Sequence, residues 1–80
     1  MSKQRVMFTF PPSLVKAPVI YELGRDFRVV TNIRRADVRD DMGWVVLELE
    51  GDDEEIKRGL NWVSSTGVQV NLVSGDVIEG

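Results

Sequence analysis

The 80-residue chain contains no cysteine and no histidine. Without cysteine there is no disulfide, no thiolate metal site, no cysteine-ligated iron–sulfur cluster and no cysteine nucleophile. Without histidine the chain lacks the usual general base at neutral pH and the commonest metal ligand. It also lacks a glycine-rich phosphate loop, so neither an ATPase site nor a dinucleotide site is supported. These absences argue against an enzyme, and we expect no cofactor and no metal.

Long hydrophobic runs are missing too, since no stretch is long and apolar enough to span a bilayer. Residues 1–5 lead directly into strand-like sequence without a signal-peptide core, so we expect a cytoplasmic protein. The net charge of -3 argues mildly against nucleic acid as the main partner. Eighty residues suffice for one domain, with an expected core over about 5–73 and a flexible acidic tail over 74–80.

Alternation of apolar and polar residues predicts strands over residues 4–10, 44–50 and 68–73. Prolines 11 and 12 end the first of these, because proline lacks the N–H that a central strand needs. The residues expected to face the core are Val6, Phe8, Phe10, Val45, Leu47, Leu49, Val68, Val70 and Leu72.

A further strand is expected over residues 28–39, and its alternation changes phase midway. Apolar positions up to Ile33 share one phase, whereas those from Ala36 onward take the opposite phase. A β-bulge near Arg34–Arg35 would bring both sets to one face, because a bulge inserts one extra residue. The alternative is a regular strand with a mixed face. The short turn at 40–43 makes this strand and the next an antiparallel hairpin.

Two segments have the period of amphipathic helices. The first begins near Pro18, and Gly24 weakens it by up to ~1 kcal/mol, which indicates close packing or early fraying there. The second begins at Asp52, which forms a capping-box pattern with Glu55, and Gly67 suits its end. Four consecutive acids at this helix start are better explained by the helix dipole than by a metal cluster.

The order strand, helix, strand, strand, helix, strand predicts an α+β fold of the ferredoxin-like βαββαβ type. In that fold a four-stranded antiparallel sheet carries two helices on one face. The other face is open, and its apolar members Met7, Trp44 and Val46 favour a ligand or partner surface. The side chains expected on the open face are Arg5, Met7, Thr9, Asn32, Arg34, Trp44, Val46 and Glu48.

Arginine is concentrated in one part of the chain, since five of the seven arginines lie between Arg25 and Arg39. Such a strip can bind RNA, and RNA-recognition modules share this topology. Those modules carry aromatic residues at alternate positions of the third strand for base stacking. Here that strand has the single aromatic Trp44 and the acid Glu48. A solvated basic strip that offsets the acidic second helix is the better interpretation, and we expect no nucleic acid.

Asn32 is the candidate binding residue on the open face. An amide can donate and accept hydrogen bonds at once, which suits the amino or carboxylate group of a small ligand. The plainer interpretation is a surface asparagine of a strand, and residue type alone favours it.

Several short motifs, in this order and spacing, resemble the NIL domain. The family is named for an Asn-Ile-Leu signature in the second strand, which Asn32 and Ile33 match and in which Arg34 replaces the leucine. The resemblance extends from Val6 to about Leu72. The motifs that carry it are Phe10-Pro11-Pro12, Ala17-Pro18-Val19-Ile20, Asn32-Ile33-Arg34-Arg35-Ala36, Gly43 with Leu47-Glu48-Leu49-Glu50-Gly51, and Trp62.

This resemblance implies a ferredoxin-like fold related in arrangement to ACT-like, amino-acid-binding regulatory domains. NIL domains occur at the C-terminus of the ATP-binding subunits of methionine importers, where they pair and bind methionine to stop transport. They also occur joined to iron–sulfur ferredoxin modules and as free-standing proteins. By this resemblance Asn32 contributes to ligand binding. A transporter or redox role would come through a protein partner, because this chain has neither of those modules.

We therefore expect a non-catalytic regulatory module that binds an amino acid, methionine first, as a homodimer. Asn32 would hold the polar end of the ligand, and Met7, Trp44 and Val46 would pack against its thioether chain. Arg34 would pair with the carboxylate, since a regular strand places it on the same face as Asn32. The alternative is a ligand-free protein–protein interaction or dimerisation module that acts through the open face.

Overall fold

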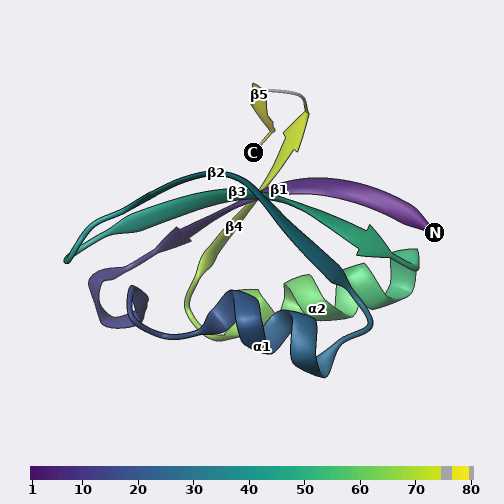
Figure 1. The fold of residues 1–80 in the computed structure, drawn as a ribbon, viewed down its shortest axis with the longest axis horizontal. Helices are drawn as coiled ribbons and strands as arrows, with labels where there is room; N and C mark the ends of the chain where they lie inside the picture. Colours follow the sequence, from purple (N-terminus) through teal and green to yellow (C-terminus); the bar gives the residue numbers. More distant parts are fainter. Residues whose placement is uncertain (75–76, 80) are drawn as a thin grey trace.

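The computed structural model describes residues 1–74 and 77–79. Its elements follow the predicted order of strands and helices, so the α+β class is confirmed (Figure 1). In chain order they are β1 (Ser2–Phe10), the 3₁₀ helix η1 (Pro12–Leu14), α1 (Val19–Asp26), β2 (Val30–Val38), β3 (Gly43–Gly51), α2 (Asp53–Ser65), β4 (Gln69–Ser74) and β5 (Val77–Glu79).

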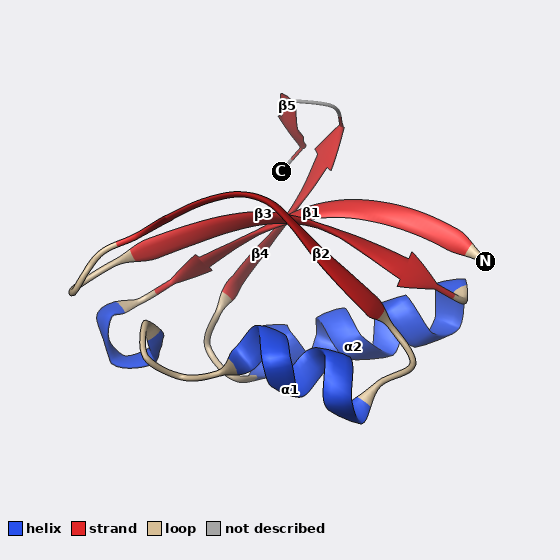
Figure 2. Cartoon of the chain, in the orientation of Figure 1, coloured by secondary structure: helices blue, strands red, loops and turns tan. Residues whose placement is uncertain are grey.

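The strands form one sheet in the order β2-β3-β1-β4-β5, and every neighbouring pair is antiparallel. Figure 2 shows both α-helices on the same side of this sheet, while the opposite face has no helix over it. The predicted ferredoxin-like sandwich with a four-stranded antiparallel sheet, β2-β3-β1-β4, is therefore confirmed.

The range that was expected to be a flexible tail contains the short strand β5. This strand pairs with β4, with Val73 opposite Ile78, and adds a fifth strand at that edge of the sheet. The end of β4 and β5 extend away from the helix layer (Figure 2). Residues 75–76 and 80 lie outside the described residues.

The centre of the fold is the pairing of β1 with β3. Nine residue pairs join these strands, and their inward pairs include Val6 with Leu47 and Phe8 with Val45. Burying one such side chain fully stabilises the fold by about 1.5–3 kcal/mol. The buried core comprises Val6, Phe8, Phe10, Val19, Leu23, Val29, Val45, Leu47, Leu49, Ile56, Val63 and Val68.

The predicted β-bulge in β2 is confirmed. Ile33 lies opposite Leu47 and Arg35 lies opposite Val46, so the register shifts and Arg34 has no partner position on β3. Beyond the bulge Ala36 lies opposite the buried Val45. Ile33 before the bulge and Ala36 and Val38 after it therefore all lie on the helix side, which an uninterrupted alternation would not allow.

The two helices pack closely at one point, where Gly59 of α2 meets Leu23 of α1. A Cβ atom built on Gly59 would lie 2.7 Å from Leu23 Cδ1, and Leu23 is completely buried. Gly24 has no such contact, because its Cβ would meet nothing nearer than 3.9 Å, so of the two interpretations of Gly24 close packing is excluded. At the rim of the helix layer the rings of Phe27 and Trp62 lie 5.8 Å apart.

The predicted capping box at the start of α2 is wrong. Asp52 is the N-cap residue but its side chain makes no capping hydrogen bond. The Glu55 carboxylate instead accepts a hydrogen bond of 2.8 Å from the backbone N–H of Arg28 and lies 3.0 Å from Arg58. Glu55 thus ties α2 to the segment that precedes β2. At the other end Gly67 has a φ of 105°, the left-handed conformation expected after a helix.

Alanine substitutions at the two helical glycines should have opposite effects on stability. Gly24→Ala should raise the free energy of unfolding by about 0.5–1 kcal/mol, since alanine favours the helix and meets no close atom. Gly59→Ala gains the same propensity but overpacks the core against Leu23, which costs about 1–3 kcal/mol. Urea unfolding of both variants checks this, and a Gly59→Ala protein as stable as Gly24→Ala would contradict it.

Removal of one of the two adjacent arginines tests the bulge, because deleting Arg34 or Arg35 produces the same chain. The shortened β2 should form an uninterrupted ladder in which Ile33 still faces Leu47 and Ala36 still faces Val45. We expect a folded protein with these cross-strand contacts intact, measured as nuclear Overhauser effects. Pairing of Ala36 with Val46 instead would show that the extra residue does not set the register.

Candidate functional site

The open face of the sheet carries a line of three polar side chains from three neighbouring strands. Asn32 on β2 lies opposite Glu48 on β3, and Glu48 lies opposite Arg5 on β1. We call these residues the polar row. Neighbouring strands are about 4.8 Å apart, so the row spans roughly 10 Å across the sheet. Asn32 is exposed, whereas Glu48 and Arg5 are half-buried.

Next to the polar row lie three apolar side chains, Met7, Val46 and Trp44, which we call the apolar patch. Met7 lies directly opposite Val46, and Trp44 is two residues from Val46 on the same side of β3. All three are half-buried. The structure therefore brings these predicted site residues together on one face. Asn32 lies opposite Glu48, which is two residues from Val46 on the same face of β3, so Asn32 is next to the apolar patch.

Arg34 does not occupy the ladder position that a regular strand would have given it. Because of the bulge, the residue opposite Val46 on the open face is Arg35. The sequence predicted a bulge in this segment, but the placement of Arg34 beside Asn32 assumed a regular strand. Because the bulge is present, Arg34 does not take the position that a regular strand would give it. Arg35, which the sequence reasoning left out of the site, is thus the cation in register with Met7 and Val46.

The charges of the polar row are paired across the strands. Arg5 Nη2 lies 3.6 Å from Glu48 Oε2, with 28% of the arginine side chain and 24% of the glutamate side chain exposed. One ladder step away, Lys3 Nζ lies 3.9 Å from Glu50 Oε2. Both distances exceed the 2.7–2.9 Å of a strong charge-assisted hydrogen bond, and exposed ion pairs of this kind stabilise by about 0–1 kcal/mol. Sequence alternation placed Glu48 and Arg5 on this face but did not single them out.

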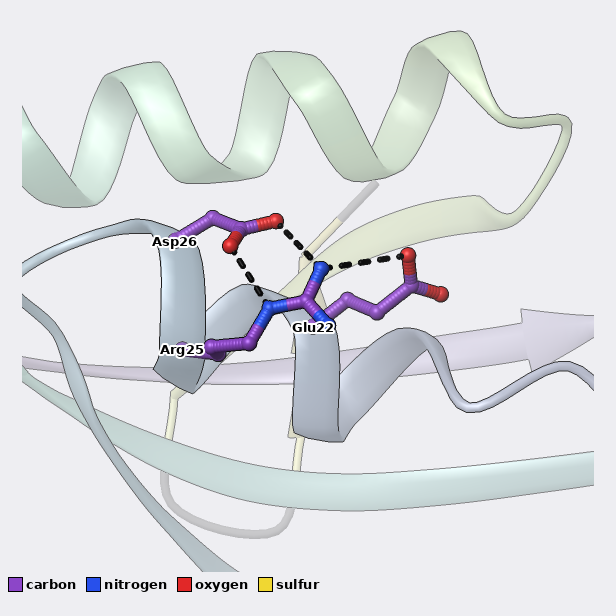
Figure 3. A network of polar contacts seen from close by, with 3 residues as sticks. All are labelled: Glu22, Arg25 and Asp26. Atoms are coloured by element: carbon purple, nitrogen blue, oxygen red, sulfur yellow. Dashed lines mark hydrogen bonds and ion pairs between the residues drawn. The ribbon is translucent and has the colours of Figure 1, made fainter.

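The clearest perturbed carboxyl group lies in the helix layer, away from the open face. Arg25 Nε donates to Asp26 Oδ1 at 2.8 Å and Arg25 Nη2 donates to Oδ2 at 3.0 Å, while Glu22 lies 3.9 Å from Nη2 (Figure 3). This hydrogen bonding lowers the pKa of Asp26 below 3.8 and raises the pKa of Arg25. The three residues lie at the exposed end of α1, so we interpret them as a surface ion-pair network.

Two surface hollows lie on the helix side of the sheet. One, of about 430 Å³, has an apolar floor that includes Ile56, Leu60 and Leu72. The other, of about 250 Å³, is lined by β2 and the start of α1, where Ile33 and Val38 remain more than half exposed. Neither hollow is lined by the polar row or the apolar patch.

Within residues 1–74 and 77–79, no three acidic side chains gather closely enough to hold a metal ion. In that same part of the chain, no helix has the length and apolar character needed to cross a membrane.

The pKa of Asp26 provides a test of the network in Figure 3. In the folded protein this carboxyl should titrate below 3.8, and Arg25→Gln should return its pKa to the ordinary range. A carboxyl with a lowered pKa stabilises the fold above its ordinary pKa, and this contribution disappears as the pH falls through the lowered value. Carbon-detected NMR titration measures the shift, and an unchanged pKa in Arg25→Gln would contradict the assignment.

A solved structure resembles this fold closely. It is described as the crystal structure of the C-terminal domain of an ABC transporter/ATP-binding protein from Enterococcus faecalis. The TM-score is 0.77 at 16% sequence identity, and the match covers 91% of this chain and 86% of that one. No curated protein sequence matches the chain.

The sequence itself matches a family model over most of its length. The model describes the NIL domain and matches residues 4–77, which include every element from β1 to β4 except the first two residues of β1. The resemblance first seen in the Asn32-Ile33 signature is thereby confirmed. This chain belongs to the NIL domain family.

Proposed function

We propose that this domain is a non-catalytic regulatory module that binds an amino acid, methionine first, at the interface of a homodimer. The observation that carries the proposal is the placement of Asn32 beside the apolar patch on an open sheet face. The resemblance to methionine-importer NIL domains implies methionine as the ligand. Binding that favours one arrangement of the dimer shifts its population, which is sufficient for regulation.

The spacing of the open face suits an unbranched side chain of methionine's length. Side chains on one face of a strand repeat every ~6.8 Å, which separates Glu48 from Val46. An extended methionine side chain reaches roughly 5 Å beyond its Cα, given bond lengths near 1.5 Å. A ligand whose polar end lies over the polar row between Asn32 and Glu48 therefore extends its thioether toward Val46, with Met7 and Trp44 beside it. In this arrangement Arg35, opposite Val46, lies beside the ligand's side chain and not beside its polar end.

A second copy of the domain would complete the site. The residues of the apolar patch are half-buried in the single chain, so a partner over the open face would remove the rest of their surface from water. The same cover would exclude water from the ligand's polar contacts and strengthen them. A dimer that closes over the ligand thus links ligand binding to the pairing of two chains.

The partner that this module would regulate is a transporter. The solved domain with this fold comes from the ATP-binding protein of an ABC transporter, and the proposal extends that setting to this chain. Such a module would act in the cytoplasm, on the side of the membrane where ATP is bound. A redox protein is the other partner class that the family resemblance implies.

The second candidate function is ligand-free dimerisation through the open face. It is favoured by the apolar patch, because Met7, Val46 and Trp44 are contiguous and can pack directly against a second copy. In this alternative the polar row lies at the rim of a dry interface and Asn32 contacts the partner chain.

Isothermal titration of the protein with a panel of free amino acids tests the proposal. We expect saturable binding of methionine that is weakened at least tenfold in Asn32→Ala, because the amide supplies both a donor and an acceptor. Asn61→Ala is the matched control, since it removes an exposed amide from α2 on the other side of the sheet. Sedimentation in the same buffers measures whether the ligand-bound protein is a dimer.

The two candidate functions give different results in this experiment. A stable dimer that produces no heat with any amino acid would exclude the ligand-binding proposal and support dimerisation alone. Equal losses of affinity in Asn32→Ala and Asn61→Ala would also contradict the proposed position of the ligand.

A further inference from the structure

Glu48 occupies the middle of the polar row. It lies on β3 between the amide of Asn32 on one side and the guanidinium of Arg5 on the other. The apolar patch begins one ladder step away at Val46 on the same strand. A ligand that lies on this patch and contacts Asn32 must therefore place its polar end beside Glu48.

The ion pair between Arg5 and Glu48 is longer than a charge-assisted hydrogen bond. Arg5 Nη2 lies 3.6 Å from Glu48 Oε2, and each side chain keeps about a quarter of its surface exposed to solvent. Charge-assisted hydrogen bonds between such groups close at 2.7–2.9 Å. Since a carboxylate accepts up to about four hydrogen bonds, Glu48 can accept from a ligand without losing Arg5.

We propose that Glu48 binds the α-ammonium of the ligand and that Arg5 binds its α-carboxylate, so the site selects free, zwitterionic amino acids. The proposal rests on the proposed function and names the chemistry of its site. Each charge of the ligand then meets an opposite charge of the protein: its ammonium contacts the Glu48 carboxylate, and its carboxylate contacts the Arg5 guanidinium. Asn32 donates or accepts at the edge of the same polar group.

This arrangement predicts rejection of analogues that lack the ammonium. A site built to receive a charged donor discriminates strongly against a ligand without it, because its own polar group is left without a partner. The α-hydroxy analogue of methionine is the suitable probe, since a hydroxyl of similar size replaces the ammonium and the thioether chain is unchanged. Methionine amide, which lacks the carboxylate, probes Arg5 in the same way.

The experiment is isothermal titration of the full chain with methionine and with its α-hydroxy analogue, for wild type and Glu48→Gln. Wild type should bind methionine at least tenfold more tightly than the analogue. In Glu48→Gln the affinity for methionine should fall and the preference should shrink to less than about threefold. Arg5→Gln should instead reduce the preference for methionine over methionine amide.

Glu50→Gln is the matched control. Glu50 lies two residues from Glu48 on the same strand and face, and it also faces a cation, Lys3, at 3.9 Å. This variant should keep the wild-type preference, which separates a local contact from a general loss of negative charge. Circular dichroism and thermal unfolding of each variant confirm that the fold is retained.

The possible outcomes separate this proposal from the one on which it rests. No methionine binding by wild type would overturn both. Methionine binding with equal affinity for the α-hydroxy analogue would overturn the role of Glu48 while the proposed function stands, and this comparison needs no variant. An unchanged preference in Glu48→Gln, or an equal loss in Glu50→Gln, would likewise assign the selectivity to another group.

Discussion

The rest of the structure depends on the antiparallel register between β1 and β3. Side chains alternate along a strand, so one register decides at once which residues enter the core and which face outward. Val6 and Phe8 meet Leu47 and Val45 on the helix side, and this completely or almost completely buried set anchors both helices. The same nine pairs place Met7 against Val46 and Arg5 against Glu48 on the outer face.

The bulge in β2 lets this strand, like β1 and β3, keep its apolar side chains toward the helices and its polar side chains on the open face. Without the extra residue, the apolar side chains after Arg35 would turn to the open face and those before it to the helices. With it, Asn32 and Arg35 both reach the outer face, and the helix side stays apolar from Ile33 to Val38. That apolar side remains largely exposed, with Ile33 at 55% and Val38 at 58%.

The functional proposals need no chemistry from the helix layer. The helices contribute packing, as at Gly59 and between Phe27 and Trp62, and Glu55 fixes the chain that enters β2. The ion pairs of Arg25 with Asp26 and Glu22 lie in this layer at the end of α1. What the sheet supplies is a surface on which polar and apolar groups from three strands lie in fixed rows.

Local pattern in the sequence was enough to predict the order of elements from β1 to β4 and the inward faces of β1 and β3, because strand and helix periods are local properties. It raised the bulge near Arg34 as one of two interpretations, and it missed β5. It also placed Asn32, Met7, Trp44 and Val46 on one face. Only tertiary structure decided which residues stand opposite one another, because register depends on pairing between distant segments. That pairing put Arg35 opposite Val46 and aligned Glu48 with Arg5 and Asn32. Tertiary packing likewise gave Glu55 a partner in Arg28 instead of a capping role.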